Sequence, residues 1–173
     1  MARPEIPQAA DELETLTSFL DYYRAVLLDK AGGLSQAELA TSLPPSTMTL
    51  AGMMYHLTVV EAHWFSDMFV GEGIGEPWAS VDWDADRDWD WNVAPSMDPD
   101  EIFEAYRQTC DRSREIVASA VSLDQLSVND RKGEKWSLRW ILVHMIEETA
   151  RHAGHADLIR ESIDGEVGDF RDV

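Results

Sequence analysis

The sequence is poor in cysteine and has no long hydrophobic run. Among its 173 residues there is one cysteine, Cys110, so no disulfide can form within the chain, and we expect a reducing, cytoplasmic setting. No apolar stretch approaches the roughly 20 residues that a membrane-spanning helix needs. The opening residues, MARPEIPQAADELE, lack a basic region followed by an apolar core, so no secretion signal is expected. These absences predict a cytoplasmic protein that does not associate with a membrane.

Positive charge is also scarce. The chain has 14 Lys and Arg against 33 Asp and Glu, a formal net charge of -19. Such a surface repels nucleic acids and anionic membranes, so neither is expected as a partner. We expect a small-molecule substrate, and an anionic one would need a local positive centre. The hydrophobic share of 45% is ordinary for a globular protein, and we expect a single domain over residues 1–173.

Helical periodicity recurs in four stretches, and no stretch makes a convincing strand. The predicted helices span residues 10–30, 46–70, 99–120 and 138–163. The second is expected to be capped by Ser46 or Thr47, the third by Asp98 and the fourth by Ser137. Four long helices predict an all-α fold, an antiparallel four-helix bundle whose sites are built from side chains on facing helices.

A long segment rich in tryptophan and aspartate separates the second and third predicted helices. It covers residues 71–99, includes WASVDWDADRDWDW and carries four of the seven tryptophans. Aspartate is a poor strand former, so we interpret the segment as a loop that crosses over the bundle. Loops of this length in compact domains are often functional. Its indoles could roof a cavity or fill gaps between helices.

The stretch HMIEETARHAGH, residues 144–155, holds three of the five histidines. On a helix, Glu148 and His152 lie about 40° apart, and both fall with His144 and His155 within an arc of about 80°. Apolar residues of the same helix share these angles, so the four polar groups are expected to face the interior. A carboxylate there must be protonated, paired or bound to a cation. The pattern therefore indicates either a metal site or buried histidines bonded to backbone carbonyls.

A metal site would need a further ligand from another helix. The second predicted helix offers two histidines, His56 and His63, and His56 is closer to the middle of its apolar segment. Two imidazoles and one carboxylate suit zinc, nickel or ferrous iron and leave positions open for water or substrate.

Three segments together resemble the DinB-like superfamily of four-helix metalloproteins, in particular an actinobacterial branch. They are ETLTSFLDYYRAVLLDKAGGLSQAEL, LAGMMYHLTVVEAHWF and WSLRWILVHMIEETARHAGHADLIRESIDG. The resemblance implies metal ligation by His56 on the second helix and by Glu148 and His152 on the fourth. Glu148 stands where the superfamily typically has histidine. Mycothiol-dependent maleylpyruvate isomerases, which are members of the same superfamily, also carry a Glu-x-x-x-His pair with zinc.

The resemblance also implies an activity. We expect a divalent-metal-dependent transferase or isomerase, with zinc as the first choice of metal, that uses a low-molecular-weight thiol such as mycothiol and acts on a small electrophile. His155 is the candidate catalytic or substrate-contacting residue, and Arg151 and Arg160 are candidates for binding the cofactor or an anionic group of the substrate. His144 and His63 are kept as alternative ligands, and Cys110 is expected in the core. Metal-dependent hydrolysis and a non-catalytic metal- or ligand-binding role in stress response remain alternatives, and a homodimer is expected.

Overall fold

The computed structural model describes residues 3–168, and this part of the chain is all-helical, as predicted. It contains no strand over these residues, where three isolated bridges are the only β-type pairings. The ends of the predicted domain, residues 1–2 and 169–173, lie outside the described residues. No helix within 3–168 has the length and apolar character to cross a membrane.

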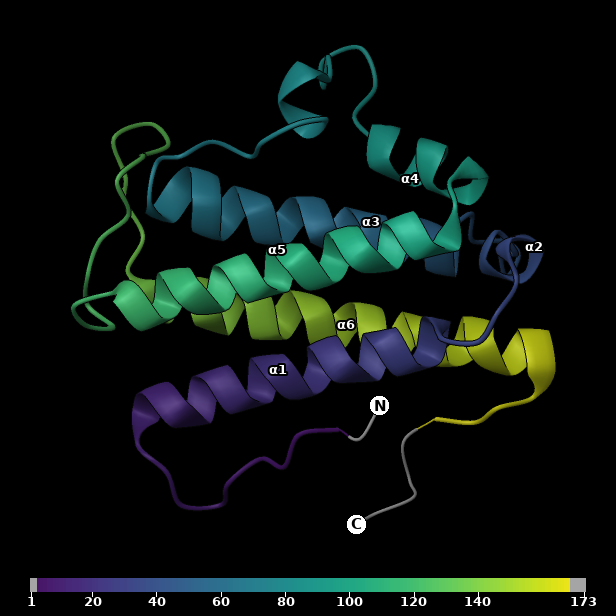
Figure 1. Ribbon diagram of the computed structural model, residues 1–173, viewed down its shortest axis with the longest axis horizontal. Coiled ribbons are helices and arrows are strands. Elements are labelled where there is room, and N and C mark those ends of the chain that lie inside the picture. The colour runs from purple at the N-terminus through teal and green to yellow at the C-terminus, as the bar shows by residue number, and fades with distance from the viewer. Residues whose placement is uncertain (1–2, 169–173) are drawn as a thin grey trace.

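Four long helical segments lie side by side in the molecule (Figure 1). They are α1 (Glu12–Ala31), α3 (Leu50–Glu61) continued by the π-helix η1 (Ala62–Phe69), α5 (Pro99–Ser119) and α6 (Leu138–Asp164). α1 packs mainly on α6, and α3 packs mainly on α5. The caps predicted for the last two helices are confirmed, because Asp98 accepts a hydrogen bond from the backbone of Asp100 and Ser137 accepts one from that of Trp140.

The second long helix begins later than predicted. Thr49, and neither Ser46 nor Thr47, caps α3 by accepting a hydrogen bond from the backbone N–H of Gly52 at 3.0 Å. The Ser46 hydroxyl instead accepts from the backbone of Met48 in a local turn, so it cannot cap the helix. A short helix, α2 (Gln36–Leu39), lies between α1 and this turn.

The segment between η1 and α5 is not the uninterrupted loop that the sequence predicted. It contains the short helices η2 (Trp78–Ser80), α4 (Trp89–Val93) and η3 (Ala94–Ser96). α4 packs on α3, and Figure 1 shows this part of the chain outside α3, at the top of the view. Trp78 is buried against the core, so the prediction of gap-filling indoles is right for this residue.

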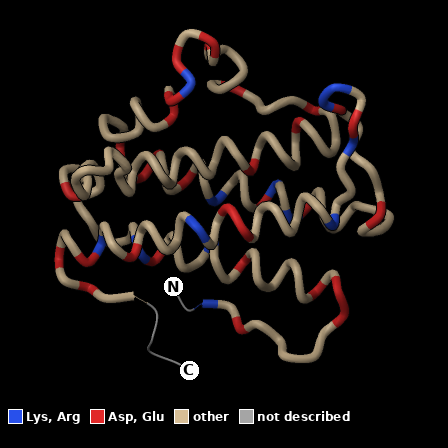
Figure 2. Tube along the Cα trace, turned by 180° about the vertical axis from the view of Figure 1, so that it is seen from behind, with Lys and Arg blue, Asp and Glu red and all other residues tan. Residues whose placement is uncertain are grey.

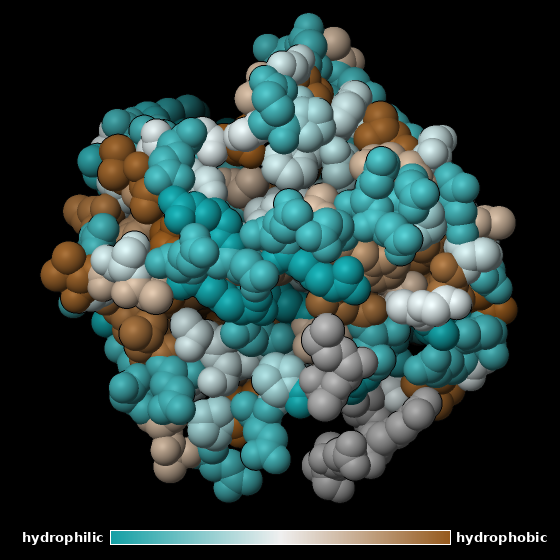
Figure 3. Space-filling model, viewed as in Figure 1, coloured by the Kyte–Doolittle hydropathy of each residue, from teal (hydrophilic) through white to brown (hydrophobic). Residues whose placement is uncertain are grey.

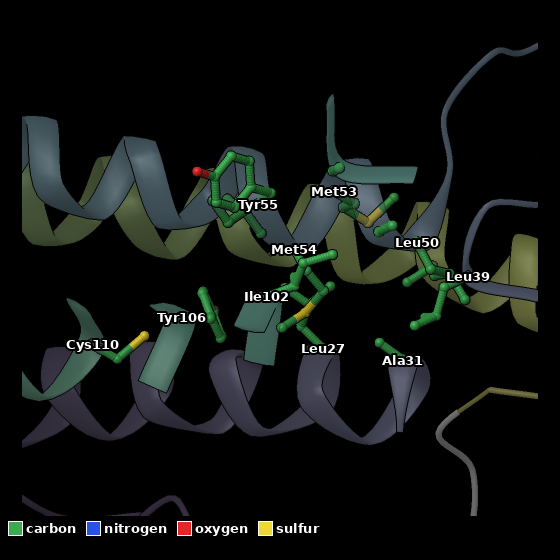
Figure 4. Close-up of a cluster of buried hydrophobic side chains, with 14 of the residues drawn as sticks. Leu27, Ala31, Leu39, Leu50, Met53, Met54, Tyr55, Ile102, Tyr106 and Cys110 are labelled. Atoms are coloured by element: carbon green, nitrogen blue, oxygen red, sulfur yellow. The ribbon is translucent and has the colours of Figure 1, made fainter. Parts of the chain in front are cut away.

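The core consists of two hydrophobic clusters, and Figure 4 shows part of the larger one. A charged layer lies where they meet. The guanidinium of Arg24 on α1 donates two hydrogen bonds of 2.7 Å to Glu61 at the end of α3, and the hydroxyl of Ser113 on α5 donates a third to the same carboxylate. All three side chains are buried. Cys110 lies beside this layer in the core, as predicted, and burial followed by the charge of Glu61 raises the pKa of its thiol.

Acidic positions occur along the helices and the connecting segments, whereas basic ones are few (Figure 2). Hydrophilic residues cover much of the face seen in Figure 3, and hydrophobic ones gather toward its edges. The negative charge of the chain is therefore distributed over many of its elements.

Candidate metal centre

His56, Glu148 and His152 form a cluster between α3 and α6. One donor atom from each lies within 4.8 Å of the other two, and no other group of three or more such residues was found among residues 3–168. The Nε2 atoms of His56 and His152 lie 3.7 Å and 3.3 Å from Oε1 of Glu148. The structure thus brings together the three residues that the resemblance implied as ligands.

The helices position these side chains from two directions. Glu148 and His152 are one turn apart on α6, and His56 projects from the middle of α3. His152 is buried, with 7% of the residue exposed, whereas the side chains of His56 and Glu148 are 24% and 16% exposed, so the cluster has one side open to solvent. Hydrogen bonds from His152 and then from His56 lower the pKa of Glu148. Burial would lower the pKa of His56, but its bonds to Asp90 and Glu148 outweigh that effect and raise it to about 9.

A fourth residue, Asp90, fixes the orientation of His56. Its Oδ2 atom accepts a hydrogen bond of 2.7 Å from Nδ1 of His56, and its side chain is buried at the start of α4. Because Nδ1 carries the proton in this bond, Nε2 is left to face Glu148. A carboxylate in this position behind a histidine is the usual support of a metal-binding imidazole.

Trp91, the next residue along α4, covers the cluster. Its indole stacks on the ring of His56, with centroids 4.9 Å apart and an interplanar angle of 29°, and it also contacts His152. The indole fits because position 52 of α3 is glycine. A Cβ atom at Gly52 would lie 2.7 Å from Cε3 of Trp91, which is closer than such contacts occur. The predicted use of a crossover indole as a roof thus applies to Trp91.

The remaining three histidines lie outside the cluster, and two of them, His144 and His155, belong to the predicted inward arc. The ring of His155 is 5.5 Å from that of His152, and its Nδ1 atom is buried without a hydrogen-bond partner. Burial, followed by the charges of His152 and Arg151, lowers the pKa of His155. His144 and His63, the alternative ligands, contact Trp64 instead, and neither belongs to the three-residue cluster.

The two candidate arginines have different surroundings. Arg151 is exposed on α6, forms an ion pair with Glu147 and has Nη1 3.9 Å from Oε2 of Glu148. Arg160 is buried, and its Nη1 donates to the backbone carbonyls of Lys30 and Gly32. It also pairs with Asp164 and Glu166. A ligand would have to compete with these contacts at Arg160, whereas Arg151 lies at the edge of the cluster.

Asp90 is the residue that sequence reasoning missed. Five aspartates alternate with other residues from Asp82 to Asp90, and nothing in that alternation ranks them. The burial of Asp90, which distinguishes it from the exposed Asp82, Asp84 and Asp88, is known only from the structure.

The donor set fits a divalent cation. Two imidazole nitrogens and one carboxylate oxygen are the ligands of many catalytic zinc sites, which keep a position open for water or substrate. In the structure one carboxylate oxygen lies 3.3 Å from Nε2 of His152 and 3.7 Å from Nε2 of His56, and a cation would take the place of the protons between these groups.

Comparison with known proteins identifies the family to which the chain belongs. The model of the mycothiol-S-transferase family matches residues 15–165, which include all three residues of the cluster and Asp90. A search of curated proteins found no match. Because the family match extends over most of the chain, the protein belongs to the mycothiol-S-transferase family, within the DinB-like superfamily.

Proposed function

We propose that this protein is a divalent-metal-dependent S-transferase that joins mycothiol to a small electrophile. Two observations support the proposal: the family match over residues 15–165 and the three donor atoms within 4.8 Å of one another. The four long helices are proposed to form the antiparallel bundle of the DinB-like superfamily, with the segment from η1 to α5 as its crossover. The use of a small cellular thiol agrees with the cytoplasmic location that the single cysteine leads us to expect.

In this proposal His56 and His152, each through Nε2, and Glu148 hold the metal. Zinc is the first choice, and nickel or ferrous iron would accept the same donors. When bound, such a cation favours the ionised form of a thiol or water next to it and supplies positive charge. The site needs that charge because the protein is strongly acidic.

The chain's own groups have separate roles. Asp90 holds the imidazole of His56 in one tautomer and orientation, and Trp91 shields its face from water. His155 is proposed to receive the thiol proton, since it is the next imidazole along α6 and its Nδ1 has no partner. Arg151 is proposed to attract an anionic group of a substrate at the rim. For Arg160 the contacts to α1 favour a structural role, and a substrate role remains a prediction.

Metal content tests the proposal most directly. Protein purified without added metal is expected to contain about one metal ion per chain, and His56→Ala and His152→Ala are expected to lose it. His63→Ala is the matched control for metal content alone, since its side chain is 45% exposed and lies outside the cluster. His56→Ala and His152→Ala should also lose the ability to conjugate mycothiol to an electrophile. The rate of product formation measures this loss. Metal-free wild-type protein with full transferase activity would refute the proposal, and thiol-independent ester cleavage would favour the hydrolase alternative.

A further inference from the structure

Five aromatic rings form a continuous cluster at one end of the seam between η1 and α6. We call it the indole platform: His63 and Trp64 on η1, Trp136 just before α6, and Trp140 and His144 on α6. The rings of Trp64 lie 5.4 Å from Trp136, 5.2 Å from Trp140 and 4.9 Å from His144. Trp140 and His144 are stacked, with centroids 5.1 Å apart and an angle of 21° between the rings.

The indole platform lies along the same pair of helical segments as the metal centre. Trp64 follows His56 by eight residues, and Trp140 precedes Glu148 by eight. At 1.5 Å per residue both separations correspond to about 12 Å along the helices. His144 is one turn from Glu148 and contacts Trp64 across the seam, so it lies between the two groups. A ligand with its reacting atom at the metal centre could therefore reach the platform.

The platform remains accessible to a ligand. Trp140 is 45% exposed, and Val143, on the next turn of α6, is 52% exposed. Trp64 and Trp136 are partly buried against the smaller core cluster, which anchors the inner edge of the platform. The outer rings are thus held in place by packing and still offer surface to solvent. A planar group can bind there with little reorganisation.

The chemistry of the platform selects one kind of ligand. Indole faces carry negative electrostatic potential, so they stack best on electron-poor rings or cations. The two imidazoles have acidic neighbours, Asp67 beside His63 and Glu147 beside His144, which disfavour an anionic ligand. A polyol ligand would need many hydrogen-bonding groups on the protein, whereas the platform offers mostly the faces of aromatic rings. A polyol is therefore a poor fit.

We infer that the indole platform binds an electron-poor aromatic ring that the electrophilic substrate carries about 12 Å from its reacting carbon. This inference rests on the proposed function, because it assigns the acceptor that the thiol attacks. With an alkyl halide joined to such a ring by a spacer, the thiolate sulfur forms a C–S bond to the alkyl carbon and the C–halogen bond breaks. Halide leaves with the bonding electrons, and the thiol proton passes to His155 and then to solvent. No oxidant or reductant is needed.

Steady-state kinetics with two electrophiles test the assignment. Trp140→Ala is expected to raise the KM for an iodoacetamide that carries a dinitrophenyl ring on a spacer of about 12 Å. The increase should be roughly threefold to tenfold, the range that corresponds to the loss of one aromatic stacking contact. The KM for mycothiol and for iodoacetamide, an electrophile without a ring, should stay unchanged. Trp140→Phe should largely restore the wild-type value. Leu158→Ala, which removes an exposed apolar side chain elsewhere on α6, is the matched control.

A binding experiment separates this inference from the proposed function. Unreactive dinitrobenzene should shift the indole N–H NMR signals of Trp64, Trp136 and Trp140 but not that of Trp83, and it should still do so in His152→Ala, which lacks a metal ligand. Absence of these shifts would refute the inference even if the enzyme is a transferase. Equal changes in KM for both electrophiles would also refute it. Loss of self-association in Trp140→Ala with unchanged KM values would identify the platform as a contact between copies of the chain.

Discussion

At the scale of single residues, surroundings decide which of several identical side chains can act at the metal centre. Asp90 is buried against His56, whereas Asp84 is exposed only six residues earlier. His56 and His63 both lie on the second long helical segment, yet only His56 meets groups from α6 that can share a cation with it. The resemblance to the DinB-like superfamily indicated which histidines are the metal ligands. Nothing in the repeated aspartates indicated which of them supports the site. The support of His56 could therefore not be assigned from the sequence.

Removal of that support is expected to weaken metal binding without unfolding the protein. Asp90→Ala should lower metal affinity about tenfold to a hundredfold, because the imidazole of His56 loses its fixed tautomer and orientation. Competition with a chromophoric chelator measures the change. Asp84→Ala, from the same segment, should bind metal like wild type. Equal affinities for the two variants would show that Asp90 does not support the site.

At the scale of secondary-structure elements, the sequence predicted regular helices well and irregular ones poorly. The boundaries of α5 and α6 follow from a proline, an aspartate and a serine with strong positional preferences, and both were confirmed. The π-helical η1 could not be predicted, because its apolar pattern also suits an α-helix. Within 71–97 the alternation of aspartate and tryptophan concealed α4. That helix depends on packing against α3 more than on its own five residues.

The contact of α4 with α3 depends on the glycine at position 52, which leaves room for the indole of Trp91. Gly52→Ala should displace Trp91 from the ring of His56, because the new Cβ atom would lie 2.7 Å from the indole. We expect lower metal affinity, and also lower stability despite the roughly 1 kcal/mol by which alanine favours a helix over glycine. Thermal unfolding and the chelator competition measure the two effects.

Gly154 provides the matched control for this substitution. It lies on α6 between His152 and His155, and a Cβ atom there would meet nothing within 4 Å. Gly154→Ala should therefore raise the free energy of unfolding by up to about 1 kcal/mol and leave metal binding unchanged. If Gly52→Ala behaved in the same way, the close approach of Trp91 would have no consequence for the site.

At the scale of the whole molecule, the charged layer in the core connects three helices. Glu61 accepts hydrogen bonds from Arg24 on α1 and Ser113 on α5, and it is itself 1% exposed. The all-helical fold was predictable from apolar periodicity. This layer was not, because a lone glutamate in an apolar stretch does not identify its partner.

Loss of the buried carboxylate should destabilise the whole fold. Glu61→Ala leaves the buried charge of Arg24 with only the partly exposed Asp21 as its partner, so we expect the free energy of unfolding to fall by up to about 3–5 kcal/mol. Glu72→Ala, which breaks the exposed pair with Arg112, should cost less than about 1 kcal/mol. Denaturant titration compares the two variants. Similar losses would mean that the layer contributes no more than a surface ion pair.

The order of the metal-binding residues along the chain has a consequence for split versions of the protein. A cut in the exposed part of the segment between η2 and α4, between Asp82 and Asp88, would leave His56 on one fragment and Asp90, Glu148 and His152 on the other. Neither fragment would contain all three of the proposed metal-binding residues. Metal uptake by a mixture of the two fragments would therefore report their reassembly, so the centre could serve as an internal sensor of fragment complementation.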